Sequence, residues 1–174
     1  KLSAPVCCNY QHNDAFPGSH ALSAGPLGYN GSKAAMELIA QADVVRALGT
    51  RLNPFSTLPG YGTDYWPKAA RLIQVDINAD RIGLTKRVEV AIQGDAKRVA
   101  EQLLEQLASQ AGDAGRDARL AEIARSKHSW AEELATMNHE DDDPGTTWNQ
   151  RSRDSQPERM SPRQAWRAIM AALP

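Results

Sequence analysis

Three short polar segments contain the residues of this sequence best suited to bind a ligand. They are Gly49-Thr50-Arg51, Asp76-Ile77-Asn78 and Gly94-Asp95, and each comes at the end of a strand-like run. Glycine lets the backbone approach a phosphate, the Arg51 guanidinium offers two parallel donors, and the Asp76 carboxylate can accept hydrogen bonds from ribose hydroxyls. Ligands of open α/β sheets lie outside the carboxyl ends of the strands. The nucleotide-binding candidates are therefore Gly49, Thr50, Arg51, Asp76, Asn78, Gly94 and Asp95. The alternative is that these residues only form the turns and helix caps of a structural sheet.

A second candidate site is the start of the helix that follows Gly25-x-x-Gly28-x-x-Gly31. This spacing is not the dinucleotide fingerprint G-x-G-x-x-G, and no strand adjoins it directly. The backbone amides of Gly31 and Ser32 would nevertheless point out of a helix N-terminus, which suits an anion. A structural turn is the alternative interpretation.

No set of side chains indicates a catalytic centre or a metal site, so we assign no residue to either. His12 and His20 share a loop, but no Ser–His–Asp set has a supporting context. The acidic run 141–143 fits a solvated charge cluster better than a metal loop. The adjacent Cys7 and Cys8 cannot easily pair with each other, and no zinc-site spacing accompanies them. They are expected to be buried thiols in a reducing cytoplasm.

The elements that must position these residues alternate between strand-like and helix-like patterns, which is typical of a parallel α/β sheet. Strands are predicted at 4–8, 43–48, 71–76 and 88–92, and helices at 32–41, 95–107, 116–137 and 161–173. The segment 9–31 is expected to be one long loop, a type of connection that is often functional. We therefore predict an α/β fold in which a Rossmann-like parallel sheet is flanked by helices, with a C-terminal helical linker.

Composition limits the classes of partner. With 20 Lys and Arg against 21 Asp and Glu in 174 residues, the sequence gives no electrostatic reason to expect nucleic acid or an anionic membrane as partner. No apolar run approaches the roughly 20 residues of a membrane-spanning helix. The first residues contain no signal peptide and open close to a strand, so the natural chain is expected to begin earlier.

Several blocks of the sequence resemble one group of enzymes. The stretch 7–20 (CCNYQHNDAFPGSH), running on to 25–36, resembles the sulfoacetaldehyde acetyltransferase family. More loosely, residues 4–108 resemble the acetolactate-synthase-like group of thiamin-diphosphate enzymes as a whole. The later blocks 47–55, 73–78 and 94–97 follow in the order in which that group has them.

The resemblance implies a middle domain between a pyrimidine-binding and a pyrophosphate-binding domain. Residues 1–112 would be the central α/β domain, truncated at its N-terminus, 113–157 a helix and linker, and 158–174 the start of the pyrophosphate-binding domain. The full-length protein would use thiamin diphosphate and Mg²⁺, both bound outside this segment. It would convert sulfoacetaldehyde and phosphate to acetyl phosphate and sulfite, and would form a cytoplasmic homo-oligomer, a dimer or tetramer.

The sequence departs from the group's pattern where the chemistry is done. The glutamate that activates the cofactor belongs to the first domain, and the metal signature Gly-Asp-Gly with a later Asn belongs to the third. Here Gly94-Asp95 is followed by Ala96 and Gly112-Asp113 by Ala114, so neither pair completes the signature. The segment alone is therefore predicted to be inactive.

Some relatives bind FAD or ADP in this domain through loops that match the three candidate segments. The sulfoacetaldehyde enzymes are not expected to need FAD. The alternative function is therefore a nucleotide-binding or purely structural domain of another acetolactate-synthase-like enzyme.

Overall fold

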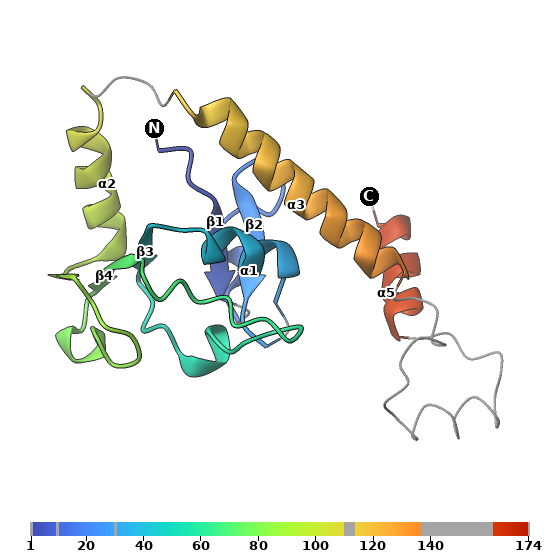
Figure 1. The fold of residues 1–174 in the computed structure, drawn as a ribbon, viewed down its shortest axis with the longest axis horizontal. Helices are drawn as coiled ribbons and strands as arrows, with labels where there is room; N and C mark the ends of the chain where they lie inside the picture. Colours follow the sequence, from blue (N-terminus) through green and yellow to red (C-terminus); the bar gives the residue numbers. More distant parts are fainter. Residues whose placement is uncertain (1, 10, 30, 110–113, 137–161, 174) are drawn as a thin grey trace. The chain divides into compact units, whose positions relative to one another are not determined.

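The computed structural model describes residues 2–9, 11–29, 31–109, 114–136 and 162–173 (Figure 1). The chain falls into two compact units, Lys1–His128 and Ser129–Pro174. The predicted linker at 138–157 lies outside the described residues. No helix in the described ranges is long and apolar enough to cross a membrane.

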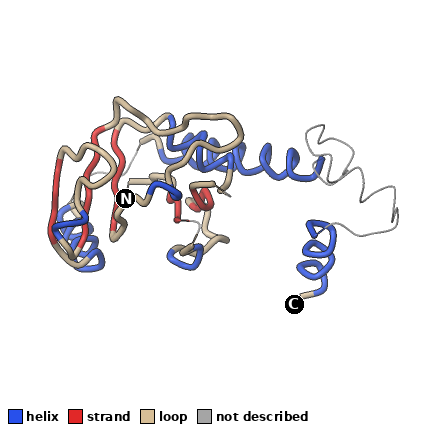
Figure 2. Tube along the Cα trace, turned by 90° about the horizontal axis from the view of Figure 1, so that it is seen from below, coloured by secondary structure: helices blue, strands red, loops and turns tan. Residues whose placement is uncertain are grey.

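The first unit contains two parallel sheets. Strand β1 (Val6–Asn9) pairs with β2 (Ser23–Leu27), and β3 (Val44–Leu48), β4 (Arg71–Asp76) and β5 (Val90–Gln93) form the second sheet in that order. Helix α1 (Lys33–Ala40) packs on β2, and α2 (Ala96–Gln106) packs on β4. Figure 2 shows the strands together with the helices that flank them. The predicted α/β fold is confirmed.

Two further helices follow along the chain. Helix α3 (Arg116–Thr136) begins in the first unit, and α5 (Pro162–Ala172) belongs to the second. Single 3-10 turns occur at η1 (Asn13–Ala15), η2 (Pro54–Ser56) and η3 (Ala79–Arg81). All four predicted helices are present; the predicted ends at 137 and 161 lie outside the described residues.

Helices α1 and α2 begin where the sequence offers a capping side chain. The Ser32 hydroxyl accepts from the Ala35 amide at 3.3 Å, and Asp95 Oδ1 accepts from the Arg98 amide at 3.0 Å. These bonds satisfy amides that have no partner inside the helix.

The prediction of one long loop over 9–31 is wrong in part, because strand β2 lies inside it. The strand reads Ser-Ala-Gly-Pro-Leu, with no β-branched residue and with the two residues least favoured in strands. Its place is set by tertiary contacts instead. Ala24 and Leu27 are buried under α1, and the backbone pairs with β1.

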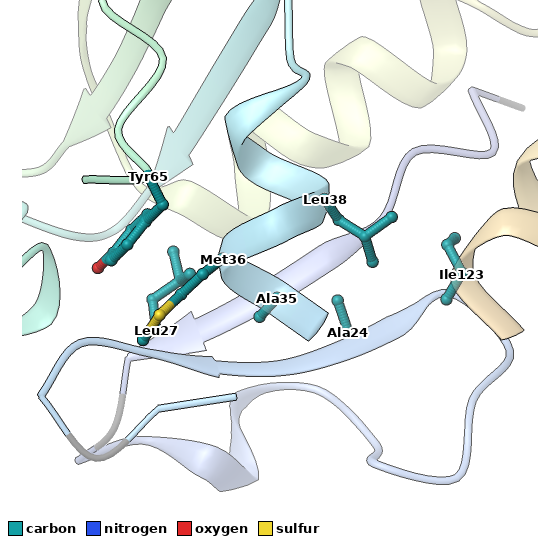
Figure 3. Close-up of a cluster of buried hydrophobic side chains, with 7 residues drawn as sticks. All are labelled: Ala24, Leu27, Ala35, Met36, Leu38, Tyr65 and Ile123. Atoms are coloured by element: carbon teal, nitrogen blue, oxygen red, sulfur yellow. The ribbon is translucent and has the colours of Figure 1, made fainter. Parts of the chain in front are cut away.

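The larger hydrophobic cluster joins β2, α1 and α3 (Figure 3). Its buried members are Ala24, Leu27, Ala35, Met36, Leu38, Tyr65 and Ile123. Met36 is 1% exposed, and Ile123 reaches the cluster from α3. A second cluster of Ala47, Leu52 and Leu72 packs with Val45, Trp66 and Val88 around the second sheet.

Cys7 lies against the larger cluster, and its thiol faces the Ala35 carbonyl oxygen at 3.9 Å. Burial raises the pKa of Cys7 to about 12, and the neighbouring Cys8 adds to the shift. An unfolded thiol ionises near its ordinary pKa of 9.0, well before the folded one. The unfolded state therefore loses its proton first, and the free energy of unfolding is expected to fall as pH rises above 9. The slope approaches about 1.4 kcal/mol per pH unit for one proton.

Urea titrations between pH 8 and pH 11 check this expectation, with Cys7→Ala as the comparison. In Cys7→Ala the free energy of unfolding is expected to fall less steeply as pH rises. The decline that remains comes from other groups, including Cys8. Identical alkaline slopes in the two proteins would show that Cys7 is not responsible.

Candidate functional site

The three candidate segments meet at the carboxyl edge of the β3-β4-β5 sheet. Leu48 pairs with Val75 and Asp76 with Gln93 in the parallel register, so the segments that follow these strands emerge side by side. The Gly49 amide donates to the Val75 carbonyl at 2.8 Å, and the Gly94 amide donates to the Asp76 carbonyl at 3.0 Å. The structure thus brings together the residues that the sequence singled out.

The first turn of α2 packs closely on two of these positions and favours glycine there. A Cβ atom at Gly49, where φ is +64°, would lie 3.3 Å from Ala96 Cβ. A Cβ atom at Gly94 would lie 3.2 Å from Val99 Cγ2. Close packing of α2 on the strand ends therefore explains both glycines without any ligand.

The polar side chains at this edge already accept hydrogen bonds from backbone amides. Asp76 is 4% exposed, and its Oδ1 accepts from the Asn78 amide at 2.9 Å. Asn78 Oδ1 in turn accepts from the Asp80 amide at 2.9 Å and starts η3. Asp95 caps α2 and puts a negative charge where a bound anion would otherwise meet the helix N-terminus. These bonds favour the interpretation of turns and caps.

Thr50 connects this sheet to the first one. Its hydroxyl oxygen accepts from the Leu52 amide at 3.1 Å and from Asn9 Nδ2 at 3.1 Å. Asn9 ends β1, so the carboxyl ends of β1 and β3 lie together. Such a junction is where open α/β sheets bind ligands. The Arg51 side chain beside it is exposed and forms no ion pair with any described residue.

Sequence reasoning missed Asn9 and Gln74 as part of this edge. Gln74 is 1% exposed, and its Nε2 donates to the carbonyls of Thr50 at 3.0 Å and Arg81 at 3.2 Å. Its Oε1 accepts from the Gly83 amide at 2.9 Å. One side chain therefore joins the loops that follow β3 and β4. The only available signal was a polar residue inside an otherwise apolar strand run.

The second candidate site at the start of α1 has its amides already bonded. Gly31 donates to the Gly28 carbonyl at 2.8 Å, and Ser32 donates to the Pro26 carbonyl at 2.7 Å. The Gly31 carbonyl accepts from the Tyr61 hydroxyl at 3.0 Å. These contacts favour the structural turn over an anion site.

Metal chemistry finds no support among the described residues. They contain no group of three or more His, Cys, Asp and Glu side chains that could hold a metal ion. Cys7 and Cys8 are both free thiols of intermediate exposure. The described residues thus offer a buried scaffold and a polar strand edge.

Comparisons with known proteins give a consistent result. Residues 1–103 match the family model described as "Thiamine pyrophosphate enzyme, central domain". The whole chain is 71% identical to a probable sulfoacetaldehyde acetyltransferase of Rhizobium meliloti (strain 1021) and 70% identical to a sulfoacetaldehyde acetyltransferase of Roseovarius nubinhibens. It spans 29% of the length of each. Over 109 residues it is 34% identical to the acetolactate synthase isozyme 3 large subunit of Escherichia coli, which is 63% of this chain and 18% of that protein.

Proposed function

Since the chain belongs to the family of thiamine pyrophosphate enzyme central domains, we propose that it is the central domain of a sulfoacetaldehyde acetyltransferase. The observation that carries this proposal is the difference in similarity. Identity is 71% over the full chain to a relative of that name, against 34% over 109 residues to an acetolactate synthase. The whole protein would convert sulfoacetaldehyde and phosphate to acetyl phosphate and sulfite.

The described residues contain no set of side chains that fits Mg²⁺, the metal ion that the proposed cofactor requires. Asp95, which follows Gly94 as in the metal signature, caps α2 and is followed by Ala96. No carboxylate cluster in the described ranges could hold the ion. The proposal therefore puts both groups outside this segment, and the contribution of this chain is a rigid scaffold.

The proposed domain division is 1–112 for the central domain, 113–157 for a helix and linker, and 158–174 for the start of the pyrophosphate-binding domain. The family match through residue 103 supports the first part. Helix α5 supports the last, because Trp166, Ile169 and Met170 are all exposed at helical spacing. Such a stripe suits a helix that packs on a further domain.

Assay of the intact protein tests the proposed activity. Sulfite and acetyl phosphate are expected from sulfoacetaldehyde only when thiamin diphosphate, Mg²⁺ and phosphate are all present. The 174-residue chain alone is expected to bind no thiamin diphosphate in calorimetry. Absence of sulfite from the intact protein would contradict the substrate, and tight Mg²⁺-dependent cofactor binding by the short chain would contradict the domain division.

The alternative function is binding of ADP or FAD at the carboxyl edge. It is favoured by the meeting of Gly49, Asp76 and Gly94 beside the exposed Arg51. Titration of the intact protein with ADP and FAD distinguishes the two, with Arg46→Ala on β3 as a charge-matched control. We expect no binding that depends on Arg51; binding that Arg51→Ala abolishes and Arg46→Ala preserves would establish the alternative.

A homo-oligomeric state, dimer or tetramer, and a cytoplasmic location complete the proposal. Light scattering of the intact protein after size-exclusion chromatography checks the first. A single species with the mass of one chain would contradict it.

A further inference from the structure

A surface cavity of about 910 Å³, open to solvent, lies at the opposite edge of the β3-β4-β5 sheet from the candidate site. Two segments line it, residues 64–72, which lead into β4, and residues 85–89, which lead into β5. Because β4 and β5 are parallel, both segments enter the sheet at its amino edge. The Glu89 amide donates to the Leu72 carbonyl at 2.9 Å and joins the two. The cavity is therefore separate from the edge that holds Gly49 and Gly94.

The inner wall of this cavity is part of the protein core. Trp66 and Val88 are half-buried and pack against the cluster of Ala47, Leu52 and Leu72. Lys86 Nζ lies 4.8 Å from the centroid of the Trp66 ring, a cation–π contact that places its charge over the wall. The cavity thus has an apolar surface, formed by Trp66 and Val88, beside a positive charge.

The rim of the cavity carries an excess of positive charge. The basic residues that line it are Lys68, Arg71, Lys86 and Arg87. The acidic residues are Asp64 and Glu89. Lys68 is neutralised by Asp64, with Nζ and Oδ2 2.9 Å apart. Neither Arg71 nor Arg87 forms an ion pair with any residue that the structure describes.

This local charge is not a consequence of general basicity, since the whole sequence has a net charge of -1. A concave site of one sign concentrates oppositely charged ligands. Guanidinium groups match the geometry of phosphate oxygens and bind them through paired hydrogen bonds. An apolar wall next to them suits the organic part of the same ligand.

We propose that this cavity binds a small organic phosphate, with Arg71 and Arg87 holding the phosphate group and Trp66 and Val88 contacting the organic part. This inference goes beyond the proposed function, because the amino edge of the sheet plays no part in it. Both orthophosphate and phosphate esters carry the recognised group, and they differ in whether the apolar wall contributes.

Calorimetric titration of the intact protein with AMP and with orthophosphate, without thiamin diphosphate or Mg²⁺, tests the site. Wild type and the control Arg116→Gln/Arg125→Gln, which removes two exposed charges of α3, are expected to bind AMP equally. Arg71→Gln/Arg87→Gln is expected to weaken binding at least about tenfold, because charge-assisted bonds are lost. Trp66→Phe is expected to reduce the change in tryptophan fluorescence when AMP binds. Circular dichroism verifies that each variant is folded.

The outcomes distinguish an organic phosphate from orthophosphate, and a specific site from general charge attraction. AMP binding much tighter than orthophosphate binding indicates an organic phosphate, as proposed. Equal affinity for the two overturns the role of the apolar wall, and no binding of AMP overturns the site. Equal weakening in both double variants indicates general charge attraction and overturns the site. Binding that Arg51→Ala removes while Arg71→Gln/Arg87→Gln preserves it belongs to the carboxyl edge and also overturns the site.

Discussion

Gly28→Ala is expected to lower the free energy of unfolding by about 2–4 kcal/mol, the sum of backbone strain and steric overlap. Gly28 has a φ of +100°, a conformation that side chains rarely adopt. A Cβ atom there would lie 2.4 Å from the Phe55 carbonyl oxygen and 2.9 Å from Ser56 Cα. These are backbone atoms, so no rotation of a side chain can relieve the overlap. Urea unfolding of the chain measures the loss.

Substitutions at two other glycines separate the backbone strain from the steric overlap. Gly62 has a φ of +72° with nothing within 4 Å of an added Cβ, so Gly62→Ala carries only the strain, about 1 kcal/mol. Gly18 has open space and no positive φ, and Gly18→Ala is expected to be neutral or slightly stabilising. If Gly28→Ala proves no more costly than Gly62→Ala, the close approach to Phe55 is not energetically important.

This close approach also explains a pattern that the sequence left ambiguous. The spacing Gly25-x-x-Gly28-x-x-Gly31 was a candidate anion motif because a helix follows it. In the fold, a Cβ at Gly31 would lie 2.6 Å from the Pro26 carbonyl oxygen, and the Tyr29 amide donates to the Phe55 carbonyl at 3.2 Å. Two loops cross here at backbone distance. Glycine can indicate close packing as well as a ligand, and the sequence alone does not distinguish the two.

Local signals account for the elements that the sequence predicted. Helices α1 and α2 are marked by a capping residue and an apolar stripe, and β4 by a run of Leu72, Ile73 and Val75. Strand β2 has no such signal, because Gly25 and Pro26 occupy its centre. Its position depends on β1 and α1, which are contacts that no sequence window contains.

The candidate edge shows the same division between local and distant information. Parallel strands bring their carboxyl ends to one edge, so the meeting of Gly49, Asp76 and Gly94 follows from the fold class. The bond from Asn9 to Thr50 joins residues 41 positions apart, and the sequence gives no register from which to infer it. The same holds for Gln74, whose partners lie in two different loops.

Gln74→Leu is expected to lower the free energy of unfolding by about 2–3 kcal/mol, although leucine is similar in size and more apolar. The change removes three hydrogen bonds and leaves the Thr50 and Arg81 carbonyls and the Gly83 amide without this partner. Each lost bond is worth about 1 kcal/mol where the groups are only partly buried. Urea unfolding gives the total, and hydrogen exchange at Gly83 and Leu52 shows whether both loops loosen.

Two further variants show whether the loss of stability in Gln74→Leu comes from the lost hydrogen bonds and not from replacing a glutamine in a strand. Gln93→Leu replaces an exposed glutamine of β5 whose Nε2 has only a 3.5 Å contact with the Ile77 carbonyl, so little change is expected. Gln74→Glu keeps the acceptor for Gly83 but directs a carboxylate at two carbonyl oxygens, and at neutral pH it should cost more than Gln74→Leu. A glutamate as stable as the native glutamine would mean that the two donated bonds do not hold the loops. The carboxyl edge would then be positioned by the strand register alone.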